Sequence, residues 1–240
     1  MTSPNMTLPV IGIAGVTVPG ALDCLSKMHQ LSALMCGGHH HHPRFVLDQP
    51  DFGVVHAAQL QERWDIVEDS IVGSLQRLAV AGAQLAVIPA NTVHCRIDGI
   101  RQRSPVPVLS MLDVVAADCQ RRGLRRVGVL GTRWTMQSHL YRAPFAAVGI
   151  EECIPDPAQQ AMLQQVIFDE LVPTGRASAD GLRQLLLVVA GLRAEGCDGL
   201  ALACTELPLV LDEANCGMPA VDTTAALAAA AMQAVLGASG

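Results

Sequence analysis

Cys204 stands where an α/β protein would present a reactive thiol. It lies in Ala201-Leu-Ala-Cys-Thr-Glu-Leu207, after an apolar run and before a segment that we expect to be helical. A thiol has an ordinary pKa of about 8.5, and backbone amides at a helix N-terminus favour its thiolate form. A cysteine considered alone is most often a small buried hydrophobic residue. The strand-end setting and the internal repeat described below favour a functional thiol.

A second polar segment, Pro89-Ala-Asn-Thr-Val-His94, follows another apolar run. The side chains and amides of Asn91 and Thr92 could hold a substrate carboxylate without adding a charge, or they could cap a helix. His94 could act as an acid or base, although packing is the favoured interpretation. Thr132 follows a further strand-like run and could offer its hydroxyl and amide to an anion, or serve as a turn residue.

Other kinds of site are disfavoured. His39–His42 lie between two glycines and Pro43, which is typical of a solvated loop, and no complementary ligand cluster accompanies them, so we expect no metal site. The chain has no GxGxxG or P-loop motif for nucleotides and no Gly-x-Ser-x-Gly elbow of a serine hydrolase. Its formal net charge of −6 argues against nucleic acid or an anionic membrane as the main partner.

The composition indicates a globular protein with a core of small and aliphatic residues. Half of the 240 residues are hydrophobic and only 3% are aromatic. No apolar run approaches the ~20 residues that a membrane-spanning helix needs. The N-terminus lacks the pattern of a secretion signal, and the eight cysteines are scattered without CxxC pairs. We therefore expect a reduced, cytoplasmic protein without a membrane partner.

Short apolar runs alternate with longer segments of helical periodicity. The expected strands are Val10–Ala14, Phe45–Leu47, Leu85–Ile88, Val106–Leu109, Arg126–Leu130 and Gly199–Ala203. The expected helices include Gln59–Ala81, Met111–Arg122, Ala158–Leu171 and Ala179–Glu195. Strand-then-helix alternation with nearly continuous apolar strands predicts an α/β fold with parallel, doubly buried sheets.

The chain also resembles itself. Three pairs of segments occur in the same order, at offsets of 116, 114 and 112 residues: Ile11-Gly-Ile-Ala-Gly15 with Val127-Gly-Val-Leu-Gly131, Ala81–Thr92 with Glu195–Glu206, and Val106–Ser110 with Met218–Asp222. Together they predict two related α/β halves. We expect one half to contain residues 1–112 and 215–240, and the other to contain residues 113–214.

The repeat aligns Ala90 with Cys204. Open α/β sheets bind ligands at the carboxyl ends of their strands, so two such halves facing each other would form one cleft. We therefore expect Ala90 and Cys204 to face each other across it. A Cβ–Cβ distance of roughly 7–10 Å would bracket one tetrahedral carbon.

Four motifs, in order, resemble those of the aspartate/glutamate racemase family. The four segments are Pro89-Ala-Asn-Thr-Val-His94, Leu130-Gly-Thr-Arg-Trp-Thr-Met136, Ala203-Cys-Thr-Glu-Leu-Pro208 and Val221-Asp-Thr-Thr224. The resemblance runs from about Ile11 to Leu236. It implies two flavodoxin-like parallel-sheet domains related by a pseudo-twofold axis, with the active site between them, and a mechanism that needs neither PLP nor any other cofactor. It also implies a homodimer.

The resemblance further implies that two cysteines flank the α-carbon of a small amino acid or related carboxylate. One would remove a proton from one face, and the other would return a proton to the opposite face. Cys204 matches the second of these cysteines. The matching positions for the substrate's α-carboxylate and amine are Asn91, Thr92, Thr132 and Thr205.

This chain departs from the family pattern in ways that bear on function. Ala90 replaces the first family cysteine, either by natural divergence or by an engineered change, and alanine has no proton to give. The opening segment Ala14-Gly-Val-Thr-Val-Pro-Gly-Ala21 lacks the family glutamate, and no arginine and lysine match those that grip an acidic side chain. His94 and Thr17 are the nearest candidates to serve the opposite face, and Thr17 is also a candidate substrate-binding residue.

Three functions remain open from the sequence. The leading hypothesis is an amino-acid racemase or epimerase-like isomerase that uses Cys204 as one acid/base. The second is a one-base reaction, such as a decarboxylation in which Cys204 protonates an enolate. The third is a binding protein that keeps the carboxylate site but has lost turnover.

Overall fold

The computed structural model describes residues 9–36 and 40–237 and contains two compact units. Each unit has one four-stranded sheet, and every strand pairing is parallel. The strands of the first sheet are β1 (Ile11–Ala14), β2 (Phe45–Asp48), β3 (Leu85–Val87) and β4 (Val108–Leu109). Those of the second sheet are β5 (Arg126–Gly131), β6 (Glu151–Cys153), β7 (Gly199–Ala203) and β8 (Ala220–Asp222). The predicted α/β class with parallel sheets is confirmed.

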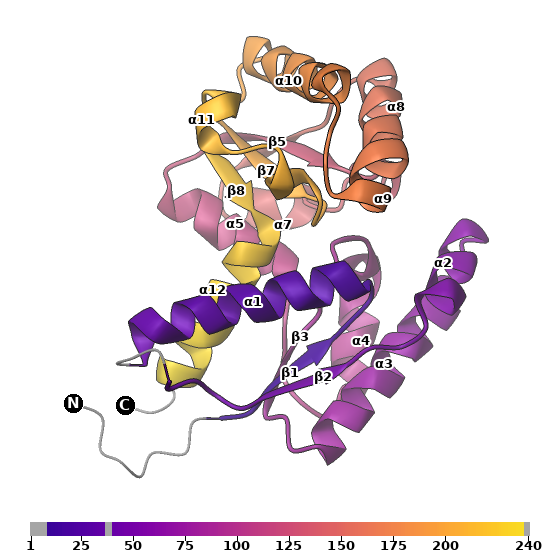
Figure 1. The fold of residues 1–240 in the computed structure, drawn as a ribbon, viewed down its shortest axis with the longest axis vertical. Helices are drawn as coiled ribbons and strands as arrows, with labels where there is room; N and C mark the ends of the chain where they lie inside the picture. The colour runs from indigo at the N-terminus through magenta and orange to yellow at the C-terminus, as the bar shows by residue number, and fades with distance from the viewer. Residues whose placement is uncertain (1–8, 37–39, 238–240) are drawn as a thin grey trace. The chain divides into compact units, whose positions relative to one another are not determined.

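Helices connect the strands in both units (Figure 1). The earlier part of the chain forms α1 (Val18–Met35), α2 (Phe52–Leu60), α3 (Trp64–Val80), the 3₁₀ helix η1 (Thr92–Arg96), α4 (Ile97–Arg103) and α5 (Met111–Arg121). The later part forms α6 (Arg133–Gln137), α7 (Arg142–Ala147), α8 (Pro157–Val166), the π-helix η2 (Ile167–Leu171), α9 (Val172–Thr174), α10 (Ala179–Ala194), the 3₁₀ helix η3 (Leu207–Leu209), α11 (Glu213–Cys216) and α12 (Thr223–Gly237). None of the described helices is long and apolar enough to cross a membrane.

The strand order is the same in the two units. The first sheet has the order β2-β1-β3-β4, and the second has the order β6-β5-β7-β8. The repeated segments of the sequence therefore fall on corresponding strands: β1 with β5, β3 with β7, and β4 with β8. Within the second unit, Gly131 of β5 pairs directly with Ala203 of β7, so these two strands end side by side.

The repeat extends to the turns that lead into β3 and β7. Gly82 and Gly196, one in each unit, have φ angles of 94° and 90°. The amide of the residue after each glycine bonds to the carbonyl five residues back, from Ala83 to Leu78 and from Cys197 to Leu192. Only glycine adopts this left-handed conformation without strain, which explains a glycine at both positions.

A glycine in the first strand of each unit lets a helix approach the sheet closely. A Cβ on Gly12 would lie 3.3 Å from Leu78 Cδ1, and one on Gly128 would lie 2.7 Å from Leu192 Cδ1. The two leucines are themselves corresponding residues of α3 and α10. The helix that precedes β3 in the first unit and the helix that precedes β7 in the second therefore pack against their sheets in the same way.

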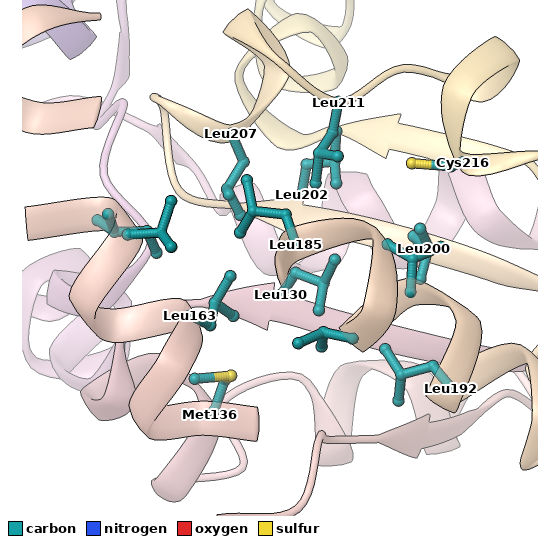
Figure 2. Close-up of a cluster of buried hydrophobic side chains, with 14 of the residues drawn as sticks. Leu130, Met136, Leu163, Leu185, Leu192, Leu200, Leu202, Leu207, Leu211 and Cys216 are labelled. Carbon is teal, nitrogen blue, oxygen red and sulfur yellow. The ribbon is translucent and has the colours of Figure 1, made fainter. Parts of the chain in front are cut away.

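Each unit has its own apolar core. Figure 2 shows the core of the second unit, in which side chains from β5, β7, α8 and α10 converge. The fully buried strand β7 lies within it, and Leu207 of η3 adds a side chain from just beyond that strand. Cys204 packs against this core while remaining partly buried, so the core holds the strand end that carries the thiol.

The structure differs from the sequence-based expectations in several places. The helix predicted over Gln59–Ala81 is two helices, because the chain turns between Leu60 and Trp64 with Glu62 at a φ of 56°. The strand β6 was not predicted, since its two glutamates give it no apolar run. Residues 215–223, predicted to belong with the first half, lie in the second unit because β8 pairs with β7, and the chain divides between Thr223 and Thr224.

Candidate active site

The carboxyl end of β3 carries Ala90, Asn91, Thr92 and His94 on one short segment. Ala90 is partly buried, and its amide bonds to the Ile88 carbonyl at 2.8 Å. Asn91 is only 5% exposed and precedes η1, but its side chain does not cap that helix. The alternative interpretation of Asn91 as an N-cap therefore does not apply here.

His94 is buried, and both of its ring nitrogens engage the backbone. Nε2 accepts a hydrogen bond from the Met111 amide at 3.0 Å, while Nδ1 lies 2.8 Å from the Ala90 carbonyl oxygen. An acceptor Nε2 leaves the proton on Nδ1, so the ring is neutral and donates to Ala90. In this arrangement the imidazole holds the strand-end segment in place through both of its ring nitrogens.

The carboxyl end of β7 brings a thiol and a carboxylate together. Cys204 follows the last strand residue, and its Sγ donates to Glu206 Oε2 at 2.9 Å. Cys204, Thr205 and Glu206 are all partly buried. The amide of Leu207 bonds to the Cys204 carbonyl at 3.1 Å, which closes a tight turn around the thiol.

The pKa of Cys204 is raised well above that of an ordinary thiol. Burial is the largest cause, followed by the field of the Glu206 carboxylate and the hydrogen bond that it accepts. Hydrogen bonds from the backbone amides of Glu206 and Thr205 lower the pKa, but by less than the other causes raise it. The expectation of a favoured thiolate is therefore wrong, and so is the expected helix, because only the short η3 turn follows.

Two threonines lie at further strand ends. Thr17 is the N-cap of α1, and its Oγ1 accepts from the Gly20 amide at 3.2 Å. Thr132 precedes α6 and makes no side-chain cap; its Oγ1 lies 3.4 Å from Thr135 Oγ1. Because β5 and β7 end side by side, Thr132 and Cys204 share one edge of the second sheet.

The first unit thus groups Ala90, Asn91, Thr92 and His94, with Thr17 after the neighbouring strand β1. The second unit groups Thr132, Cys204 and Thr205. Among the described residues, no group of three or more histidines, cysteines, aspartates or glutamates could hold a metal ion. His39 lies outside the described residues, while His40–His42 are exposed.

The sequence was compared with those of known proteins. A family model of Asp/Glu/hydantoin racemases matches residues 9–231. The chain belongs to this family. The resemblance drawn from four short motifs is therefore confirmed over nearly the whole sequence.

Individual racemase-family relatives are similar along much of their length. The broad specificity amino-acid racemase RacX of Bacillus subtilis is 29% identical over 164 residues, covering 68% of this chain and 70% of that protein. A glutamate racemase of Mycobacterium leprae is 29% identical over 221 residues, covering 88% of this chain and 70% of that one. A Yersinia pestis protein solved as a candidate Asp/Glu racemase is 27% identical with a TM-score of 0.88, covering 95% of this chain and all of that one.

Glu206 is the site residue that the sequence interpretation missed. It lies within the racemase-like segment Ala203–Pro208, where the sequence pattern alone assigns it no role. Its position two residues after the thiol was visible in the sequence. What was not visible is the tight turn that brings its carboxylate back onto the sulfur.

Proposed function

We propose that the protein is a cofactor-independent amino-acid racemase-like isomerase in which Cys204 is an acid/base at the substrate α-carbon. Membership of the racemase family supports the class of reaction. The observation that carries the role of Cys204 is its thiol at the end of β7, held in a tight turn beside Thr132. Ala90 occupies the corresponding position after β3, where it can neither give nor take a proton.

We further propose that the two strand ends act on one small amino acid or related carboxylate. Asn91, Thr92, Thr132 and Thr205 would hold its α-carboxylate and amine with uncharged groups. The internal repeat supports this arrangement, since Ala90 and Cys204 follow corresponding strands of identically ordered sheets. Thr17 would contribute through its position at the end of β1.

Removal of the α-proton has a high energetic barrier, because the α-proton of an amino acid is only weakly acidic. Its removal leaves negative charge on the α-carbon and carboxylate. Preorganised hydrogen-bond donors in a site shielded from water stabilise such charge far better than bulk water does. Hydroxyl and amide groups at strand ends can do this without the reorganisation that mobile water requires.

Incubation with a panel of L- and D-amino acids in deuterated buffer tests the proposal. Incorporation of deuterium at the α-carbon with inversion supports a racemase. A second candidate, a one-base reaction, predicts exchange or protonation without inversion, and the absence of a thiol at Ala90 favours it. Binding without any exchange would contradict both and leave a carboxylate-binding protein.

We also propose a cytoplasmic homodimer. The family resemblance supports the dimer, and the eight cysteines, which are scattered along the sequence without CxxC pairs, support a reducing compartment. Sedimentation at micromolar concentration tests the first point. A monomer under those conditions would contradict it.

A further inference from the structure

Glu206 differs from Asp118 and Glu152, two carboxylates of the second unit with buried side chains, in the kind of group that contacts it. Asp118 is paired with Arg121 and Arg122, and Glu152 lies beside His139 and Arg142. The Glu206 carboxylate instead accepts a hydrogen bond from the Cys204 thiol, at 2.9 Å. No described arginine, lysine or histidine forms an ion pair with Glu206. The charge of this carboxylate therefore acts on the thiol without a nearby cation to offset it.

The turn that holds the two groups together is well anchored. The Leu207 amide bonds to the Cys204 carbonyl at 3.1 Å, and the Leu209 amide bonds to the Glu206 carbonyl at 3.2 Å. Between them, the Leu207 side chain is fully buried in the core of the second unit (Figure 2). The fold thus sets the backbone positions from which the Cys204 and Glu206 side chains meet.

We propose that Glu206 is a positioning residue that keeps the Cys204 thiol protonated and fixes the direction of its S–H bond. Building on the proposed function, this makes Cys204 a proton donor in the resting protein. In a one-base reaction such as decarboxylation, the C–C bond to the departing carboxylate breaks and leaves a carbanion at the α-carbon as CO₂ is released. The S–H bond of Cys204 then breaks as a C–H bond forms at that carbon, and the thiolate left beside Glu206 takes a proton from water, which leaves hydroxide. A thiolate and a carboxylate in hydrogen-bond contact repel each other, so the protonated state returns readily.

The contact with Glu206 also makes Cys204 less able to act as a base at neutral pH. Before it can accept an α-proton it must first become a thiolate next to an existing negative charge. Burial and Glu206 both raise the pKa of this thiol, so the thiolate is scarce at neutral pH. With Ala90 unable to supply a second base, the structure favours proton delivery over proton removal at this strand end.

Alkylation of the protein tests whether Glu206 keeps the Cys204 thiol protonated, and it needs no substrate. Iodoacetamide modification of the Cys204 peptide, followed by mass spectrometry from pH 6 to 11, gives the midpoint of thiolate formation. In Glu206→Gln we expect the midpoint to fall by about one pH unit, so that labelling at pH 8 rises by roughly 5- to 10-fold. Glu206→Asp keeps the charge and should stay closer to the parent protein. Glu195→Gln, which removes an exposed carboxylate of the same unit, should leave the Cys204 midpoint unchanged.

The midpoint separates a charge effect from greater exposure, because easier access raises labelling at every pH without moving the midpoint. An unmoved midpoint in a folded Glu206→Gln protein would overturn the proposal. If that variant does not fold, the ultraviolet thiolate absorbance of the parent minus that of Cys204→Ser gives the same titration. A Cys204 thiol that titrates near the ordinary value of about 8.5 would then contradict it. If the protein incorporates no deuterium into any substrate but the Cys204 midpoint falls in Glu206→Gln, the proposed function is contradicted and the proposal about Glu206 still stands.

Discussion

The imidazole of His94 accepts a hydrogen bond from the backbone amide of Met111, seventeen residues further along the chain, at 3.0 Å. With Nδ1 on the Ala90 carbonyl, one buried ring ties the end of β3 to the first residue of α5. Buried backbone groups that lose such a partner cost about 1–3 kcal/mol each.

We therefore expect His94→Ala to lower the free energy of unfolding by about 2–4 kcal/mol, measured by urea denaturation. His41→Ala removes an exposed imidazole and should have little effect. Equal stability of the two variants would mean that the His94 bridge contributes nothing to the fold.

Replacing the thiol should abolish turnover. A serine hydroxyl is far less acidic than a thiol, so Cys204→Ser should reduce α-proton exchange by at least ~10²-fold while the circular dichroism spectrum is retained. Cys36→Ser, at another partly buried cysteine, is the matched control. Full exchange activity in Cys204→Ser would remove Cys204 from the reaction.

Restoring a thiol at position 90 should restore two-sided chemistry. We expect the parent protein to exchange the α-hydrogen of one enantiomer much faster than that of the other. Ala90→Cys should raise interconversion of the enantiomers, at a stability cost of no more than ~1–3 kcal/mol for the added sulfur. Polarimetry and chiral chromatography measure the change. Ordinary enzymatic racemisation by the parent protein would show that some other group already serves the second face.

Buried thiols should weaken the fold at alkaline pH. Burial is the main cause that raises the pKa of Cys119, to about 12, so the folded state keeps this proton at pH values where the unfolded chain has lost it. The stability that this difference provides is complete below the unfolded pKa of about 8.5 and is lost as pH rises from there toward 12, by at most ~1.4 kcal/mol per pH unit. Cys119→Ala should therefore make the decline in unfolding free energy between pH 8.5 and 10.5 less steep. If the unfolding free energy of Cys119→Ala declines with pH as steeply as that of the parent protein, the Cys119 thiol does not cause the decline.

The paired turns offer a test of the repeat. Gly82→Ala and Gly196→Ala should each destabilise the protein by about 1–2 kcal/mol, because both positions have positive φ. Gly73→Ala lies within α3, where a Cβ would make only an ordinary contact 3.5 Å from Arg77 Nη1. That variant should be unchanged or more stable by up to ~1 kcal/mol. An unchanged free energy of unfolding in only one of Gly82→Ala and Gly196→Ala would mean that the two turns do not both require a glycine.

The strands that could be predicted are those with a continuous apolar run in the sequence. β5 and β7 have nearly continuous apolar runs and stand out, whereas the edge strand β6 starts with two glutamates and does not. The break at Glu62 was missed because the apolar periodicity continues across it, and only the backbone angle marks it.

The positions of the candidate site residues in the fold could be predicted in part, while their roles remain proposals. The repeat pointed to positions 90 and 204, because strand ends are set by the order of apolar runs and glycines. The raised pKa of Cys204 was not predictable, since it depends first on burial and then on the turn that folds Glu206 back onto the sulfur. The role expected of His94 also depended on contacts that no local pattern encodes, as Met111 lies on a different element.

The division of the chain has a consequence for its synthesis. The second unit is one uninterrupted stretch, Leu112–Thr223, whereas the first combines Met1–Met111 with Thr224–Gly240. Domains generally fold as units while the chain emerges from the ribosome. The unit that carries Cys204 can therefore complete its fold during translation, while the unit that contains β1 must wait for α12, which follows the whole of the second unit in the sequence.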